Sequence, residues 1–176
     1  MKPISCARES RLRRVTILGL LLVSSIAIAD TYTGRVVGVA DGDTVTVLDS
    51  TNTQHKVRLA GIDAPEKKQA YGQVSKQHLA NLLFDKTVTI ETTKRDRYQR
   101  EVGIVIVNGR DANLKQLESG LAWHYKKYAD EQPAADRQSY AAAEVAAQQR
   151  HQGLWQDANP VPPWDFRHQK NERRLQ

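Results

Sequence analysis

The stretch VRLAGIDAPE (residues 57–66) ends a predicted β-strand with a short acidic loop. Apolar and charged residues alternate up to Leu59, so Arg58 is expected on the face opposite the core. Pro65 stiffens the loop and keeps Ala64 extended, which leaves the Ala64 carbonyl free to meet a ligand. This pattern indicates a site built at the end of a strand.

Short strands and helices surround this stretch. β-Branched and aromatic residues that alternate with polar ones indicate strands, and a change to a helical period indicates helices. The predicted elements are, in chain order, a hairpin over residues 32–48 that turns at Asp41-Gly42-Asp43, a strand around 57–59, a helix at 71–84, strands at 88–90 and 102–107, and helices at 112–119 and 133–152. They predict an α+β, mainly β fold: a five-stranded Greek-key barrel of the OB type with three helices.

The first 29 residues read as an export signal. A basic start precedes a nearly uninterrupted apolar run from Val15 to Val23, and a small-x-small triplet ends at Ala29. A membrane anchor is the alternative, but a span needs about 20 apolar residues and this run is shorter. The mature chain is therefore expected to begin near Asp30, in the periplasm or the medium, without stable membrane association.

One domain is expected in the remaining chain, at residues 30–157, and a monomer is the expected state. Residues 158–163 hold three prolines, and residues 167–176 are polar and charged. Residues 158–163 are therefore expected to be extended, and residues 167–176 to be a mobile, basic tail.

Overall charge does not by itself indicate nucleic-acid binding. The whole chain has a formal charge of +6, but residues 1–29 hold five Lys/Arg against one Glu, which leaves 21 against 19 in the mature chain. Attraction for phosphate must come from local clusters such as residues 94–100. Cys6, the single cysteine, lies in the predicted signal, which excludes thiolate metal sites and cysteine nucleophiles from the mature chain.

Carboxylates gather at the predicted strand ends. Asp43, Asp63 and the Ala64 carbonyl, together with phosphate and water, match the oxygen ligands that Ca²⁺ prefers. Glu66 is then a spare carboxylate for a water molecule. Two alternatives remain open, because a DG pair often makes only a turn and because Asp63 and Glu66 could cap the next helix.

Two arginines and three tyrosines accompany these acids. Arg58 and Arg100 could hold phosphate oxygens through their planar forks and stabilise charge on a five-coordinate phosphorus, although either one alone could be structural. Tyr98 could contact a phosphate or a base, or pack its own turn. Tyr125 and Tyr128, interleaved with lysines, suit base stacking and phosphate attraction.

From Thr33 to Trp155 the chain resembles the staphylococcal nuclease (thermonuclease) family. The resemblance implies a Ca²⁺-dependent endonuclease and exonuclease that cleaves DNA and RNA to 3′-phosphate and 5′-hydroxyl ends. It assigns the metal site to Asp43, Asp63, the Ala64 carbonyl and, in support, Asp41. It assigns phosphate binding to Arg58 and Arg100, the general base to Glu66, and a substrate contact to Tyr125 or Tyr128. No constellation for base-specific readout is present.

Two positions depart from the family pattern. Gln99 replaces a glycine, and if that glycine relieves a positive φ, the exchange costs about 1 kcal/mol and could shift Arg100. Ala64 replaces a threonine and keeps its carbonyl but lacks the hydroxyl. The alternative function is a catalytically silent OB module that binds single-stranded nucleic acid or a protein partner, and the presence of all the charged positions argues against it.

Overall fold

Five long strands close into a barrel in the computed structural model, which describes residues 30–175. The strands are β1 (Asp30–Val39), β2 (Thr44–Asp49), β3 (Gln54–Leu59), β5 (Thr87–Arg95) and β6 (Glu101–Val107). They pair in the order β3-β2-β1-β5-β6, and a parallel β3–β6 pairing completes the barrel. The predicted α+β OB-type barrel is thus confirmed, whereas the predicted signal peptide lies outside the described residues.

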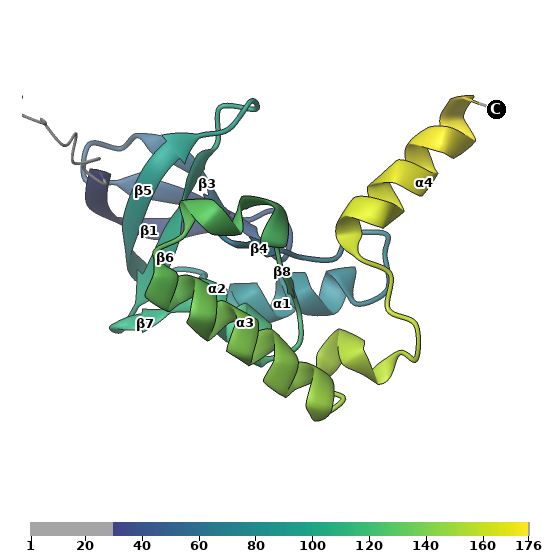
Figure 1. The fold of residues 1–176 in the computed structure, drawn as a ribbon. Helices are drawn as coiled ribbons and strands as arrows, with labels where there is room; N and C mark the ends of the chain where they lie inside the picture. Colours follow the sequence, from purple (N-terminus) through teal and green to yellow (C-terminus); the bar gives the residue numbers. More distant parts are fainter. Residues whose placement is uncertain (1–29, 176) are drawn as a thin grey trace, which may run out of the picture.

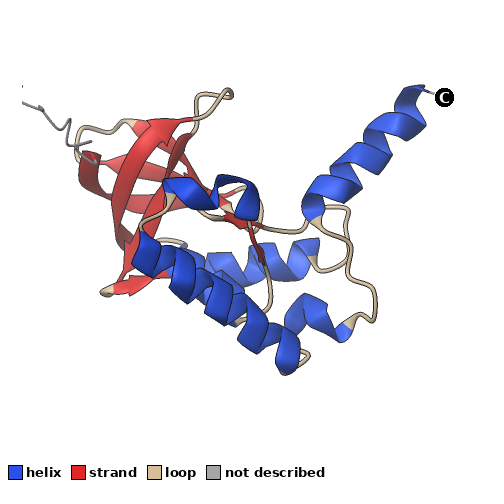
Figure 2. Ribbon diagram, in the orientation of Figure 1, coloured by secondary structure: helices blue, strands red, loops and turns tan. Residues whose placement is uncertain are grey.

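Helices cover one side of the barrel, while the strands form the other half of the molecule (Figures 1 and 2). The three predicted helices are α1 (Gly72–Leu83), α2 (Ala112–Glu118) and α3 (Ala134–Gln149). Short elements complete the chain: β4 (Ile62–Asp63), β7 (Arg110–Asp111), β8 (Trp123–His124), and the 3-10 helices η1 (Lys126–Glu131) and η2 (Gly153–Gln156).

Buried apolar side chains join the barrel to the helices. The main core is lined by strand and helix residues together, including Val36, Val45, Val57, Leu59, Leu79, Leu83, Ile90, Val105 and Leu117. Asp111 caps α2 by accepting hydrogen bonds from two backbone N–H groups. The Tyr140 hydroxyl donates to Asp111 over 2.6 Å and so ties α3 to the start of α2.

Residues 167–176 are expected to be a mobile tail, and in the structure residues Pro163–Leu175 form a fourth helix, α4. Proline suits the first position of a helix, where its missing N–H has no partner to lose, and Asp165 complements the positive end of the helix. Trp164 packs edge-on against Trp123, with ring centroids 5.7 Å apart. The far end of α4 projects away from the body of the molecule (Figure 1).

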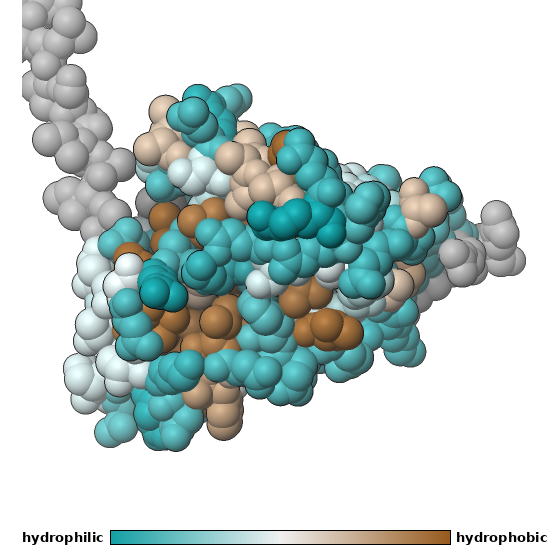
Figure 3. All heavy atoms as spheres, turned by 90° about the horizontal axis from the view of Figure 1, so that it is seen from below, coloured by the Kyte–Doolittle hydropathy of each residue, from teal (hydrophilic) through white to brown (hydrophobic). Residues whose placement is uncertain are grey.

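Within the described residues, the helices are all too short or too polar to cross a membrane. The view from below shows a largely hydrophilic face with separate hydrophobic patches (Figure 3). Most of the large apolar side chains lie in the core.

Candidate active site

The β1–β2 turn delivers the first acids. Gly42 approaches α1 so closely that a Cβ atom there would lie 1.9 Å from the Ser75 hydroxyl, which is why this position needs glycine. The Gln116 side-chain amide donates to the Gly42 carbonyl over 2.6 Å and fixes the turn. Asp41 accepts from the Asp43 N–H over 3.2 Å. The turn is thus held on both sides, and Asp43 is buried at its end.

Arg58 joins the two predicted metal carboxylates. Its guanidinium donates to Asp43 Oδ1 over 2.6 Å and to Asp63 Oδ1 over 2.8 Å. The side chain is on the face of β3 opposite the core, as predicted, but these acids cover it until only 18% is exposed. The second oxygen of Asp43 accepts from the Ala64 N–H over 2.8 Å, which links the turn to the acidic loop.

The acidic loop is fixed by a second small sheet. β4 pairs with β8 so that Asp63 lies opposite Trp123, and the Tyr125 N–H donates to the Gly61 carbonyl over 2.8 Å. Neither Asp63 nor Glu66 caps α1, whose first turn has no side-chain cap. The capping alternative is therefore wrong for these acids, which face the site instead.

Arg100 reaches the site from the β5–β6 turn. Asp96 accepts from the Arg100 backbone N–H over 3.0 Å and from its Nε over 2.8 Å, which orients the side chain. The Arg100 guanidinium also lies 3.4 Å from the Thr44 hydroxyl, which donates to Asp43 over 3.0 Å. Arg100 is therefore linked to Asp43 through the Thr44 hydroxyl.

Gln99 has a φ of 62°, so it adopts the left-handed conformation that glycine would accommodate without strain. Arg100 still faces the groove, because the Asp96 carboxylate holds it. The substitution for glycine has therefore not removed the arginine from the site.

We expect Gln99→Gly to raise the free energy of unfolding by about 0.5–1 kcal/mol. The strain of a left-handed non-glycine residue exceeds the extra entropy that glycine loses on folding. Urea unfolding measures the difference, and Gln99→Ala is the control, since alanine keeps the strain. Equal stabilisation by both variants would contradict a backbone cause.

All ten predicted site residues line one groove with a volume of about 820 Å³. These are Asp41, Asp43, Arg58, Asp63, Ala64, Glu66, Tyr98, Arg100, Tyr125 and Tyr128. Further basic side chains line the same groove, namely Lys94, Arg95, Arg97, Lys127, Arg167 and His168. Basic side chains and the acid cluster therefore line the same groove. They form the local positive cluster that is expected to attract phosphate.

Aromatic side chains form part of the groove wall. Tyr98 is 63% exposed and Tyr128 is 45% exposed. The Arg97 guanidinium lies 4.8 Å from the Tyr98 ring centre, and the Lys94 amine lies 4.8 Å from the Tyr128 ring centre. Tyr98 therefore contacts arginines of its own turn while it stays largely exposed, and exposed rings beside cations suit stacked bases and phosphates.

Three groove residues from α4, Trp164, Arg167 and His168, were missed from the sequence. Trp164 lies against Tyr125, with ring centroids 5.6 Å apart. Arg167 donates to Asp63 and Glu66. The available signal was the sequence Pro163-Trp164, a helix-starting proline followed by an aromatic residue.

Burial and charge perturb the acids in different directions. Burial and the neighbouring Asp43 carboxylate raise the pKa of Asp41 to about 6. Burial acts in the same direction at Asp43, but Arg58 and the Ala64 N–H outweigh it and lower the pKa of Asp43. Burial raises the pKa of Asp63, although Arg167 opposes this shift. The three neighbouring carboxylates of Asp41, Asp43 and Asp63 thus favour a positively charged group or ion beside them.

The donor set fits a hard cation. Asp43 and Asp63 are buried carboxylates whose side-chain partners are guanidinium and hydroxyl groups, and Asp41 lies beside them. Oxygen donors of this kind suit Ca²⁺. Within residues 30–175 no three His, Cys, Asp or Glu side chains converge as a ready-made metal site. Arginines hold the carboxylate oxygens instead.

Comparison with known proteins agrees with this geometry. The family model described as staphylococcal nuclease homologue matches residues 56–157. An uncharacterized endonuclease of Haemophilus influenzae is 40% identical over 161 residues, which cover 90% of this chain and 87% of that protein. An uncharacterized endonuclease of Escherichia coli O157:H7 is 44% identical over 138 residues, with 78% and 86% covered. A micrococcal nuclease of Shigella flexneri is 39% identical over 165 residues, with 89% and 91% covered. The chain therefore belongs to the staphylococcal nuclease family of nucleases.

Proposed function

We propose that this chain is a Ca²⁺-dependent, sugar-nonspecific nuclease that hydrolyses DNA and RNA to 3′-phosphate and 5′-hydroxyl ends. The observation that carries the proposal is the single groove in which the acids, the arginines and the exposed tyrosines meet. Carboxylates for a cation beside guanidinium forks for a phosphate are the groups that phosphodiester hydrolysis requires.

Each arginine has a distinct place in this mechanism. Arg58 presents its fork between Asp43 and Asp63, and Arg100 presents its own from the opposite turn. Both stay charged at any physiological pH and can share the negative charge that accumulates on phosphorus in the transition state. Their contacts with the surrounding acids keep both guanidinium groups in the groove.

Glu66 accepts or orients the proton of the attacking water. Its carboxylate is partly exposed in the groove, and its backbone N–H is bound by the Gln69 side chain over 3.1 Å. A carboxylate exposed in the groove can accept a proton as water attacks. Tyr98, Tyr125 and Tyr128 are proposed to hold bases or phosphates on either side of the reacting bond.

Ca²⁺ would be held by Asp43, Asp63 and the Ala64 carbonyl, with Asp41 in support, and would polarise the phosphate and activate water. Removing the cation should leave the arginines on the acids, where they are less available to phosphate. Calcium is therefore proposed to be required for turnover.

Export to the periplasm or the medium, after loss of residues 1–29, and a monomeric state are also proposed. The apolar run and the small-x-small triplet support export, and the absence of cysteine after residue 6 suits an oxidising compartment.

The silent OB module remains the competing function, and cleavage and binding measured in the same sample separate the two. End-labelled single-stranded DNA and RNA are incubated with purified protein and calcium, and Glu66→Ala protein purified in parallel controls for contaminating nucleases. We expect cleavage of both, with products that a DNA polymerase extends only after phosphatase treatment. Binding without cleavage would favour the silent module, and products that are extended without treatment would contradict the proposed ends.

A further inference from the structure

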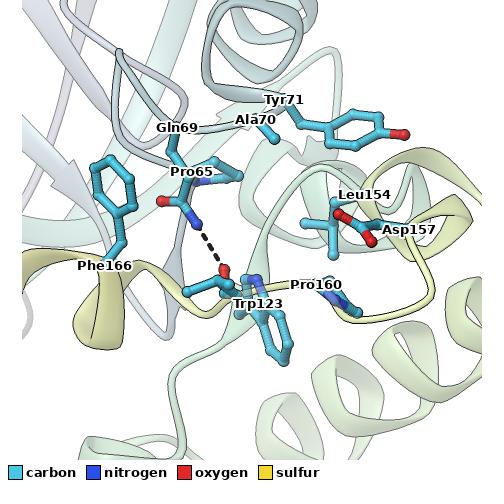
Figure 4. Close-up of a pocket in the computed structure, with 10 residues that line it drawn as sticks. Pro65, Gln69, Ala70, Tyr71, Trp123, Leu154, Asp157, Pro160 and Phe166 are labelled. Atoms are coloured by element: carbon cyan, nitrogen blue, oxygen red, sulfur yellow. Dashed lines mark hydrogen bonds between the residues drawn. The ribbon is translucent and has the colours of Figure 1, made fainter. Parts of the chain in front are cut away.

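The start of α4 packs against the domain, although α4 lies beyond the family match, which ends at residue 157. An apolar pocket of about 200 Å³ lies at its start, and its lining includes Pro65, Trp123, Leu154 and Phe166 (Figure 4). The Gln69 side-chain amide donates to the Val161 carbonyl, which fixes the chain just before the helix (Figure 4). Trp164 packs against Tyr125 on the groove side.

This packing of α4 places the guanidinium of Arg167 against the acidic loop. Its Nη2 donates to Asp63 Oδ2 over 2.7 Å, and its Nη1 donates to Glu66 Oε1 over 2.8 Å and to Asp63 Oδ1 over 3.3 Å. The Asp63 side chain is 1% exposed, whereas the Arg167 side chain is 40% exposed. Among the described residues, Asp63 Oδ2 accepts a hydrogen bond from Arg167 alone.

The positive charge of Arg167 hinders a cation from reaching the same oxygens of the Asp63 carboxylate. A guanidinium bound to a carboxylate occupies lone pairs of the carboxylate and neutralises part of its negative charge. A divalent ion that uses Asp63 must therefore displace Arg167 or accept its positive charge at close range. In either case the ion pair lowers the affinity of the site for the metal.

We propose that Arg167 is a further residue of the active site, a built-in competitor of the metal ion for the carboxylate of Asp63. α4 delivers this competitor, and its apolar packing keeps the guanidinium in place when no metal is bound. The proposal rests on the proposed function for the identity of the ion. It predicts that the enzyme needs more calcium than its acids alone would require.

Calcium binding to the purified protein without nucleic acid, measured by isothermal titration calorimetry, tests this competition. We expect Arg167→Gln to bind calcium roughly fivefold more tightly, since a partly exposed ion pair contributes about 1 kcal/mol at most. Arg167→Lys, which keeps the charge without the planar fork, should lie between the two. Lys170→Gln removes an exposed cation from the same helix and should bind like the wild type.

Salt supplies a second readout. The difference between wild type and Arg167→Gln should shrink as ionic strength rises, because a partly exposed pair is screened. Added calcium should also raise the melting temperature of Arg167→Gln more than that of the wild type, because the variant starts with uncompensated acids.

Equal or weaker calcium binding by Arg167→Gln would overturn the competition and leave the proposed nuclease untouched. A raised KM for single-stranded DNA together with such binding would make Arg167 a substrate contact instead. If neither the wild type nor Arg167→Gln binds calcium, the proposed calcium dependence fails along with the competition.

Discussion

Arg58→Lys is expected to lower kcat for single-stranded DNA about 10²–10³-fold, with a much smaller change in KM. Lysine keeps one positive charge but cannot hold Asp43, Asp63 and a phosphate in one plane, as the guanidinium can. Steady-state cleavage at saturating calcium measures both constants.

The matched control is Arg35→Lys, because Arg35 forms an exposed pair with Asp85 on the outside of the barrel. This control should retain full activity. A melting temperature for each variant separates lost chemistry from lost folding, since Arg58 also neutralises two buried acids. A fully active, folded Arg58→Lys protein would remove the arginine from the mechanism.

Glu66→Gln is expected to lower kcat about 10²–10⁴-fold while leaving substrate binding unchanged. The amide is close to the carboxylate in shape and can still accept a hydrogen bond from Arg167, but it cannot take a proton from water. Fluorescence anisotropy of a labelled single strand measures binding, and single-turnover cleavage measures the chemical step.

Glu131→Gln is the control for this variant, because Glu131 also lines the groove and pairs with Lys94 near its rim. The control should cleave at close to the wild-type rate. Similar losses in both variants would mean that groove charge, rather than a specific carboxylate, limits the reaction.

Much of the barrel could be predicted because its signals are local. Alternation marked the strands, and the Asp41-Gly42-Asp43 turn joined the first two at the predicted place. The predicted site residues lie at strand ends and turns that barrel closure brings to one edge. Their position at strand ends, together with the family resemblance, was therefore enough to expect Arg58, Arg100 and Asp63 in one place.

The C-terminal helix could not be predicted in the same way, because α4 lacks a regular apolar face. Its position depends on Trp164 and Phe166 meeting a surface made by distant residues. Long-range pairing also escapes a local pattern. The lysines between Tyr125 and Tyr128 are expected to attract phosphate, but one of them, Lys126, pairs with the buried carboxylate of Glu144 over 2.6 Å.

Calcium re-addition to chelated protein tests the central claim, a metal-dependent site at Asp43 and Asp63, most directly. The rate of single-stranded DNA cleavage is measured in wild type and Asp43→Asn after chelation and then with increasing calcium. The mechanism predicts no cleavage with chelator, full recovery in the wild type, and little recovery in Asp43→Asn. Undiminished cleavage in the presence of chelator, or full recovery of Asp43→Asn at the wild-type calcium concentration, would contradict it.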